Sequence, residues 1–96
     1  MSQYLLLIQG NAPAEPTAAE WNAFFETAGE SGLFRGGSEF GSRQIIGSGN
    51  KAISSNHIAG YMRFDSDDKQ QLTELIRTHP VVVNGGTVEL CELRES

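Results

Sequence analysis

The chain has few of the residues that build disulfide frameworks, metal sites or membrane segments. Cys91 is the single cysteine among 96 residues, which excludes an internal disulfide bond. With only His57 and His79 beside it, the sequence offers no set of zinc ligands at a workable spacing. The apolar run Tyr4 to Ile8 has the length of a strand, and no basic segment precedes it. We therefore expect a cytoplasmic protein without a structural metal.

Cations are scarce as well. Seven lysines and arginines face twelve acids, for a net charge of −5 and a pI near 4.8. This charge argues against nucleic acid or an anionic membrane as the main partner. A chain of 96 residues forms one domain, spanning residues 1–96, and so small a core leaves apolar surface that needs cover. We expect a homodimer, and a further partner that is a small molecule or a protein.

The last third of the chain predicts a strand, an amphipathic helix and a second strand. Ile58 to Phe64 alternates between an apolar and an amphipathic face, which is typical of a strand. Asp65 and Ser66 can accept hydrogen bonds from the amides of a first helical turn, so a helix is expected to begin there. The helix is expected to end near His79, which suits its carbonyl end, because Pro80 cannot continue the hydrogen-bond ladder.

A turn and a closing strand are expected to follow the apolar run Val81 to Val83. Asn84-Gly85-Gly86 predicts the turn, and Thr87 to Leu93 alternates as a strand. Cys91 falls inside this strand, where neither a helix N-terminus nor a neighbouring histidine is evident to activate the thiol. We interpret Cys91 as a packed, structural thiol and not as a nucleophile.

The first third predicts a strand followed by a helix. Gln3 to Gln9 is apolar on both faces, so it is expected to be a central strand with helices on one face and a second subunit on the other. Thr17-Ala18-Ala19-Glu20 is a capping box that starts the helix, and Gly32 is expected to end it. Between them Trp21, Phe24, Phe25 and Ala28 form an aromatic stripe, which we interpret as core packing and not as a ligand site.

The segment 33–56 is broken by glycine, serine and asparagine. A strand is expected near Leu33 to Phe40. Gln44 to Ile46 could extend it or pair with Ala52 and Ile53 across the turn Gly47 to Asn50. The Gly47-x-Gly49 pair lacks the third glycine and the following helix of a dinucleotide fingerprint, so no cofactor is expected.

The order of these elements predicts an α+β fold. Strand, helix, strand, strand, helix and strand make the ferredoxin-like split βαβ arrangement, an antiparallel sheet with two helices on one face. Five motifs along the whole chain also resemble the YCII-related family, also called the DGPF-domain family: Tyr4-Leu-Leu-Leu-Ile, Gly36-Gly37, Gly60-Tyr61, Pro80 and Gly85-Gly86-Thr87-Val88-Glu89. The resemblance implies a homodimer that pairs sheet to sheet into a dimeric α+β barrel, in a family whose biochemical role is largely unassigned.

The chain departs from that family at the positions that would carry chemistry. Lys51 to Asn56 stands where one branch has its Asp-Gly-Pro-Phe signature. Neither His57 nor His79 lies in the early segment that holds the His-Asp pair suggested as an active site in another branch. No catalytic residue is therefore carried over from the family. The chain also lacks the Gly-x-Ser-x-Gly turn that would present a serine nucleophile, which argues against a hydrolase.

A local excess of cations marks the candidate binding residues. From Ser31 to Phe64 there are four cations and one acid, a balance of +3 within a chain of −5. One interpretation is a cleft that binds a small anion through guanidinium groups, with a histidine able to exchange a proton and a tyrosine in its wall. The candidate residues are Arg35, Arg43, His57, Tyr61 and Arg63. The alternative, which we favour, is a solvated hairpin whose cations pair with the acidic helices.

Two classes of function remain open at this point. The first is a small dimeric binding or accessory protein for a small molecule. The second is a cofactor-independent enzyme that acts on a small anionic or aromatic metabolite, and it rests on analogy of fold. A screen for bound metabolites, followed by turnover assays on any that bind, separates the two classes.

Overall fold

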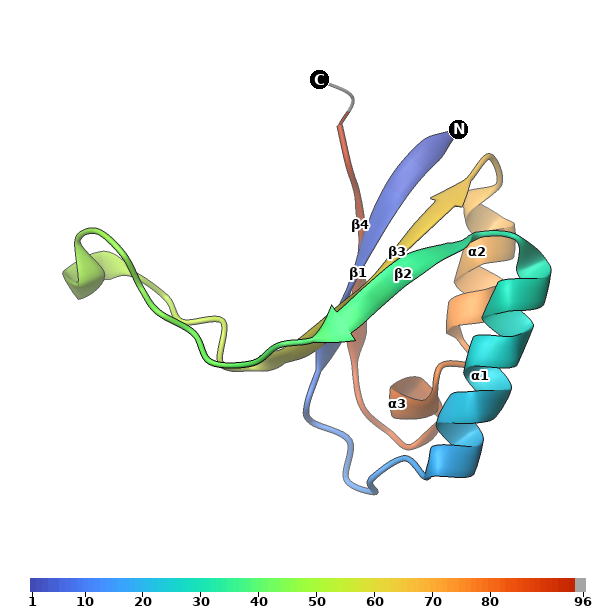
Figure 1. Cartoon of the computed structure of the whole chain (residues 1–96), viewed down its shortest axis with the longest axis horizontal. Coiled ribbons are helices and arrows are strands. Elements are labelled where there is room, and N and C mark those ends of the chain that lie inside the picture. Colours follow the sequence, from blue (N-terminus) through green and yellow to red (C-terminus); the bar gives the residue numbers. More distant parts are fainter. Residues whose placement is uncertain (95–96) are drawn as a thin grey trace.

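A four-stranded antiparallel sheet carries all the helices on one face (Figure 1). The computed structural model describes residues 1–94. The strands are β1 (Ser2–Gln9), β2 (Phe34–Glu39), β3 (Ile58–Ser66) and β4 (Val88–Glu92), in the spatial order β2-β3-β1-β4. The helices are α1 (Ala18–Ser31), α2 (Lys69–Ile76) and α3 (Pro80–Val83), with one 3₁₀ turn, η1 (Gly49–Lys51). This topology confirms the predicted ferredoxin-like fold.

The central strand β1 has two apolar faces, as predicted. Tyr4, Leu6 and Ile8 are buried against the helices, with exposed fractions of 8% or less. Leu5 and Leu7 alternate with them and are only half-buried. They lie on the opposite side of the sheet, which we call the uncovered face. Within residues 1–94 no helix packs on that face, so its apolar side chains remain open to solvent in a single subunit.

The predicted capping box starts α1. The Thr17 hydroxyl accepts a hydrogen bond from the Glu20 amide at 3.1 Å, and the Glu20 carboxylate accepts one from the Thr17 amide at 2.9 Å. Gly32 ends the helix in the left-handed region at φ 74°, also as predicted. The hydrogen bond from the Thr17 amide lowers the pKa of the Glu20 carboxyl below its usual range. Asn84 donates to the same carboxylate at 3.0 Å, which ties the start of α1 to the end of α3.

Removal of the cap should be measurable. We expect Thr17→Ala to lower the free energy of unfolding by about 1 kcal/mol, because the Glu20 amide in the first turn loses the hydroxyl that accepts its hydrogen bond. Urea denaturation followed by circular dichroism measures the change. Thr27→Ala is the matched control, since its hydroxyl only donates back to the Ala23 carbonyl on the exposed side of α1. Equal losses in the two variants would contradict a stabilising role for the cap.

The prediction for the aromatic stripe is correct for half of its residues. Phe24 and Ala28 are buried in the core. Trp21 is half-buried and Phe25 is 45% exposed, and both border a cavity described below. The sheet covers only part of this face of α1, so the rings of Trp21 and Phe25 extend past the core.

The start of the second helix was predicted too early. β3 continues through Ser66, and α2 begins after Asp68, whose carboxylate accepts from the Gln71 amide at 3.1 Å. The Ser66 hydroxyl is buried and bonds the backbone of Asp68 instead, donating to its carbonyl at 2.8 Å. Because Ser66 is buried against the core, the chain stays extended through Ser66, and the helix begins later than local capping chemistry suggests.

The predicted role of His79 is wrong. α2 already ends at Ile76, and His79 caps the N-terminus of α3, where its Nδ1 accepts from the Val81 amide at 3.1 Å. Pro80 begins this short helix and does not merely end the previous one, which agrees with the preference of proline for a first helical position. The apolar run Val81 to Val83 is therefore helical.

Neither alternative for Gln44–Ile46 is correct: these residues neither extend β2, which ends at Glu39, nor pair with Ala52 and Ile53. The last rung between β2 and β3 is the hydrogen bond from the Phe40 amide to the Ala59 carbonyl at 3.0 Å. Residues 41–56 then leave the sheet as a long loop, which we call the arm (Figure 1). Glycine at positions 41, 47 and 49 interrupts any alternating pattern there, so no ladder forms.

No helix among residues 1–94 combines the length and the hydropathy that crossing a membrane requires.

Candidate functional site

A β-bulge in β2 decides which side chains face the helices. The register of β2 against β3 shifts by one residue between Phe34 and Gly37, where Gly36 adopts a φ of 101°. A shift of one residue moves every later side chain to the other face, because side chains alternate along a strand. Glu39 therefore lies opposite Gly60, on the face that carries the helices. Without the bulge it would project from the uncovered face.

Glycines allow β2 and β3 to approach closely beside this bulge. A Cβ atom at Gly60 would lie 2.8 Å from the Ser38 carbonyl oxygen, and one at Gly37 would collide with the carbonyl oxygen of Tyr61. Both glycines border the same cavity. The close approach of the two strands thus requires glycine at both positions. Because these glycines have no side chains, open space remains on the helix side of the sheet.

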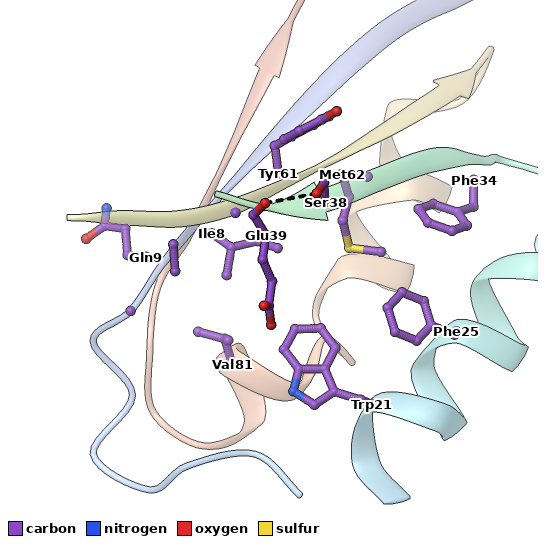
Figure 2. Close-up of a pocket in the computed structure, with 14 residues that line it drawn as sticks. Ile8, Gln9, Trp21, Phe25, Phe34, Ser38, Glu39, Tyr61, Met62 and Val81 are labelled. Atoms are coloured by element: carbon purple, nitrogen blue, oxygen red, sulfur yellow. Dashed lines mark hydrogen bonds between the residues drawn. The ribbon is translucent and has the colours of Figure 1, made fainter. Parts of the chain in front are cut away.

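That space is a cavity of about 310 Å³ between the sheet, α1 and α3 (Figure 2). This volume is at the small end for ligand sites and suits a molecule with a single ring. Figure 2 shows the rings of Trp21 and Phe25 on α1 across from the side chains of the sheet. The apolar side chains around the cavity are Ile8, Trp21, Phe25, Phe34, Met62 and Val81. An aromatic or apolar molecule would find dispersion contacts on several sides.

Glu39 supplies the one carboxylate among the residues that line this cavity. Its side chain extends from β2 toward Trp21 and Val81 (Figure 2). No hydrogen bond or ion pair of its carboxylate occurs within residues 1–94, and the residue is exposed at the mouth of the cavity. A free carboxylate beside aromatic walls can accept a hydrogen bond from a hydroxyl or an amine of a ligand, or take up its proton.

His79 lies behind the cavity and is completely buried. Its ring packs edge-on against Trp21, with 5.0 Å between ring centroids, and against Phe24 at 4.8 Å. Burial lowers the pKa of His79 from 6.5 to about 4, because a charged imidazole would lose its water. Nδ1 accepts from Val81, so the proton of the neutral ring is on Nε2, which has no hydrogen-bond partner within residues 1–94. This histidine is a neutral core residue that supports the cavity wall.

The predicted anion-binding residues lie outside the cavity, apart from the backbone of Tyr61. Figure 2 shows the Tyr61 ring pointing away from the cavity, toward the uncovered face. The Arg35 guanidinium bonds the Asp65 carboxylate at 3.1 Å and the Gly32 carbonyl at 2.9 Å, at one end of β3. Arg43 donates to the Ser55 and Ile58 carbonyls at the other end.

These arginines are far apart in a single subunit. Ile58 and Asp65 are seven strand steps apart, which is about 23 Å, so Arg35 and Arg43 do not share a cleft. The structure does connect Arg43 with Tyr61 through the Phe40 ring, whose centroid is 5.1 Å from the Arg43 guanidinium carbon and 5.7 Å from the centroid of the Tyr61 ring.

Arg63 and His57 are both exposed. Arg63 projects from the uncovered face beside Leu5, and His57 lies at the entrance to β3, where its backbone carbonyl accepts from Gly10. Anion binding by these residues stays a prediction. Cys91 lies in β4 opposite Leu5 and is half-buried, which places the thiol on the uncovered face.

No family model matches the sequence, and no curated protein matches it. A solved structure does share the fold: the 5-chloro-2-hydroxyhydroquinone dehydrochlorinase TftG of Burkholderia phenoliruptrix AC1100, in a complex with 2,5-dihydroxybenzoquinone. The TM-score is 0.55 over 98% of this chain and 95% of that chain, with 8% sequence identity. This likeness shows the fold that the two chains share.

Sequence reasoning missed Glu39 as a site residue. It noted Glu39 only as the one acid within a cationic segment. Strict alternation from Phe34 would in any case place position 39 on the other face. The signal that could have located it was the Gly36-Gly37 pair inside a strand, since glycine within a strand often marks a bulge.

Proposed function

We propose that this protein is a cytoplasmic, homodimeric binding or accessory protein for a small aromatic molecule that carries a hydroxyl or amine. The observation that carries the proposal is the cavity of about 310 Å³, which is lined by the rings of Trp21, Phe25 and Phe34 and has Glu39 at its mouth. A ring of the ligand stacks among these side chains, and its polar group donates to the Glu39 carboxylate.

The shared fold supports a flat ligand of this kind. The dehydrochlorinase of similar fold was solved with 2,5-dihydroxybenzoquinone, a single ring with two hydroxyl groups. The motifs Gly36-Gly37 and Gly85-Gly86 support our proposal that the chain is related to the YCII-related family. In this structure the first pair forms the bulge that turns Glu39 to the cavity.

The uncovered face supports the homodimer. β1 and β3 present Leu5, Leu7 and Tyr61 there, and Cys91 of β4 lies beside them. A sheet that is apolar on both faces requires cover on both. A second copy packed sheet to sheet provides it and buries the Cys91 thiol.

The second candidate function is a cofactor-independent enzyme on the same class of molecule. The observation in its favour is the position of Glu39: a carboxylate at an apolar site can act as a general base toward an acidic hydroxyl or C–H bond of a bound ring. The two functions differ in one measurable respect, because a binding protein returns its ligand unchanged.

Binding should be detectable through Trp21, the only tryptophan of the chain. Titration with hydroquinone, which has two ring hydroxyls, should change the tryptophan fluorescence saturably, and calorimetry with the same molecule should give one site per subunit. Glu39→Gln should weaken the binding of hydroquinone about tenfold, since a charge-assisted hydrogen bond is replaced by a weaker one. Chromatography of the ligand after incubation then distinguishes a binding protein from an enzyme.

The controls separate this site from the cationic residues. Glu26→Gln removes the same charge from the exposed side of α1 and should leave affinity unchanged. A parallel titration with benzoate addresses the anion prediction, because there Arg43→Ala or Arg63→Ala would weaken binding by roughly one to two decades. Tight binding of benzoate that depends on these arginines, with none of hydroquinone, would reject the cavity as the site.

A further inference from the structure

The arm carries three of the eight exposed large hydrophobic side chains within residues 1–94. Three of its side chains are isoleucines with large exposed fractions: Ile45 at 54%, Ile46 at 86% and Ile53 at 93%. Isolated apolar side chains are common on surfaces, but three on one projecting loop form a surface that protein partners cover.

The arm is held by several contacts at its base and by few along the rest of its length. Arg43 joins the two limbs through the Ser55 and Ile58 carbonyls, and its guanidinium also packs on the Phe40 ring. Beyond that point η1 contributes one backbone hydrogen bond, from the Ala52 amide to the Gly49 carbonyl at 3.2 Å. The base is therefore fixed on the sheet, whereas Ile46 and Ile53 gain little cover from their own subunit and Ile45 only part.

The arm also differs from the rest of the chain in charge. It contains Arg43 and Lys51 and no acid, which gives it a net charge of +2. The whole chain carries −5, so the remaining residues carry −7. Another copy of this acidic protein is thus a partner of complementary charge. Glu89, which is exposed on β4 opposite Leu7, is one such acid on the uncovered face.

The direction of the arm agrees with a partner at that face. Figure 1 shows the helices on one side of the sheet and the arm extending away from the sheet on the other side. A second subunit packed on the uncovered face would therefore lie on the same side of the sheet as the arm and next to it. By two-fold symmetry, each arm would meet the other subunit in the same way.

We propose that the arm, residues 41–56, clasps the second copy of this chain, with Ile45, Ile46 and Ile53 in contact with the partner and Lys51 near its acids. The inference rests on the proposed homodimer and goes beyond it, because a sheet-to-sheet dimer does not by itself require the arm. The arm then extends the interface past the edge of the sheet.

Analytical ultracentrifugation tests the clasp. Replacement of all three isoleucines by serine should raise the dissociation constant of the dimer at least about 100-fold, because apolar contacts with the partner are lost. Folding should be unaffected, since these side chains are already exposed in the single subunit. Lys51→Glu should also weaken the dimer, and more strongly at low salt. Val83→Ser, which removes a 58% exposed valine from α3, is the matched control and should have no effect.

Limited proteolysis supplies a second measurement. Trypsin cleavage after Lys51 should slow as the wild-type concentration rises through the dissociation constant, and the serine variant should lose this protection. A dimer with unchanged affinity in the serine variant would overturn the clasp and leave the homodimer standing. A wild-type monomer at high micromolar concentration would overturn both. Binding of the wild-type protein, but not of the serine variant, to vesicles of anionic lipid would instead assign the arm to a membrane surface and overturn the clasp.

Discussion

Acidification from pH 7.5 to pH 5 should destabilise the protein by about 2 kcal/mol through His79 alone. The pKa of this side chain falls from 6.5 in the unfolded chain to about 4 in the folded protein, so the unfolded state binds the proton more tightly. The stabilising contribution of the neutral ring is complete above pH 6.5 and is lost as the pH falls toward 4.

The structure explains why the folded protein resists the proton. His79 is 0% exposed and lies between the rings of Trp21 and Phe24. Protonation would place a charge there without a carboxylate in contact and would remove the Nδ1 lone pair that accepts from Val81. Both consequences act against the folded state.

Urea denaturation at a fixed protein concentration, at half-unit steps between pH 5 and 7.5, measures this dependence. His79→Gln should be less stable at neutral pH and should lose most of the slope. His57→Gln is the matched control, because His57 is exposed, and it should keep the slope of the wild type. A slope that survives in His79→Gln would refute the assignment to the buried ring.

Leu7→Asp should convert the homodimer to monomers. Leu7 lies near the middle of the uncovered face, between Tyr61 of β3 and Glu89 of β4. A carboxylate buried there between two subunits, directly beside Glu89 of the neighbouring strand, costs several kcal/mol. In the separated subunit the same side chain reaches solvent, so the fold should persist.

Light scattering after gel filtration at micromolar concentration should show a dimer for the wild type and a species near 10.4 kDa for Leu7→Asp. Asn22→Asp adds the same charge to the exposed side of α1 and should remain dimeric. Cys91 adds a chemical readout, since its thiol should react faster in Leu7→Asp than in the wild type. A wild type that elutes as a monomer would contradict the proposed dimer, and a dimeric Leu7→Asp would place the interface elsewhere.

The sequence by itself determined the elements whose causes are local. The Thr17–Glu20 capping box needs only neighbouring residues, and it forms as predicted. The alternation of β1 and β3 follows from the pleat of a strand, so the core face with Leu6 and Phe64 and the uncovered face with Leu5 and Leu7 could both be predicted. The order of these elements was enough for the ferredoxin-like fold.

Only the tertiary structure decided the site. Glu39 faces the cavity because the bulge at Gly36 shifts the pairing of β2 with β3, and alternation along one strand contains no information about its partner's register. His79 is a neutral core residue because two rings of α1 enclose it, although its neighbours in sequence resemble the end of a helix. The arm lies off the sheet because it lacks a ladder partner. For Glu39 and His79 the deciding contact joins residues distant in sequence, and local propensity cannot specify such contacts.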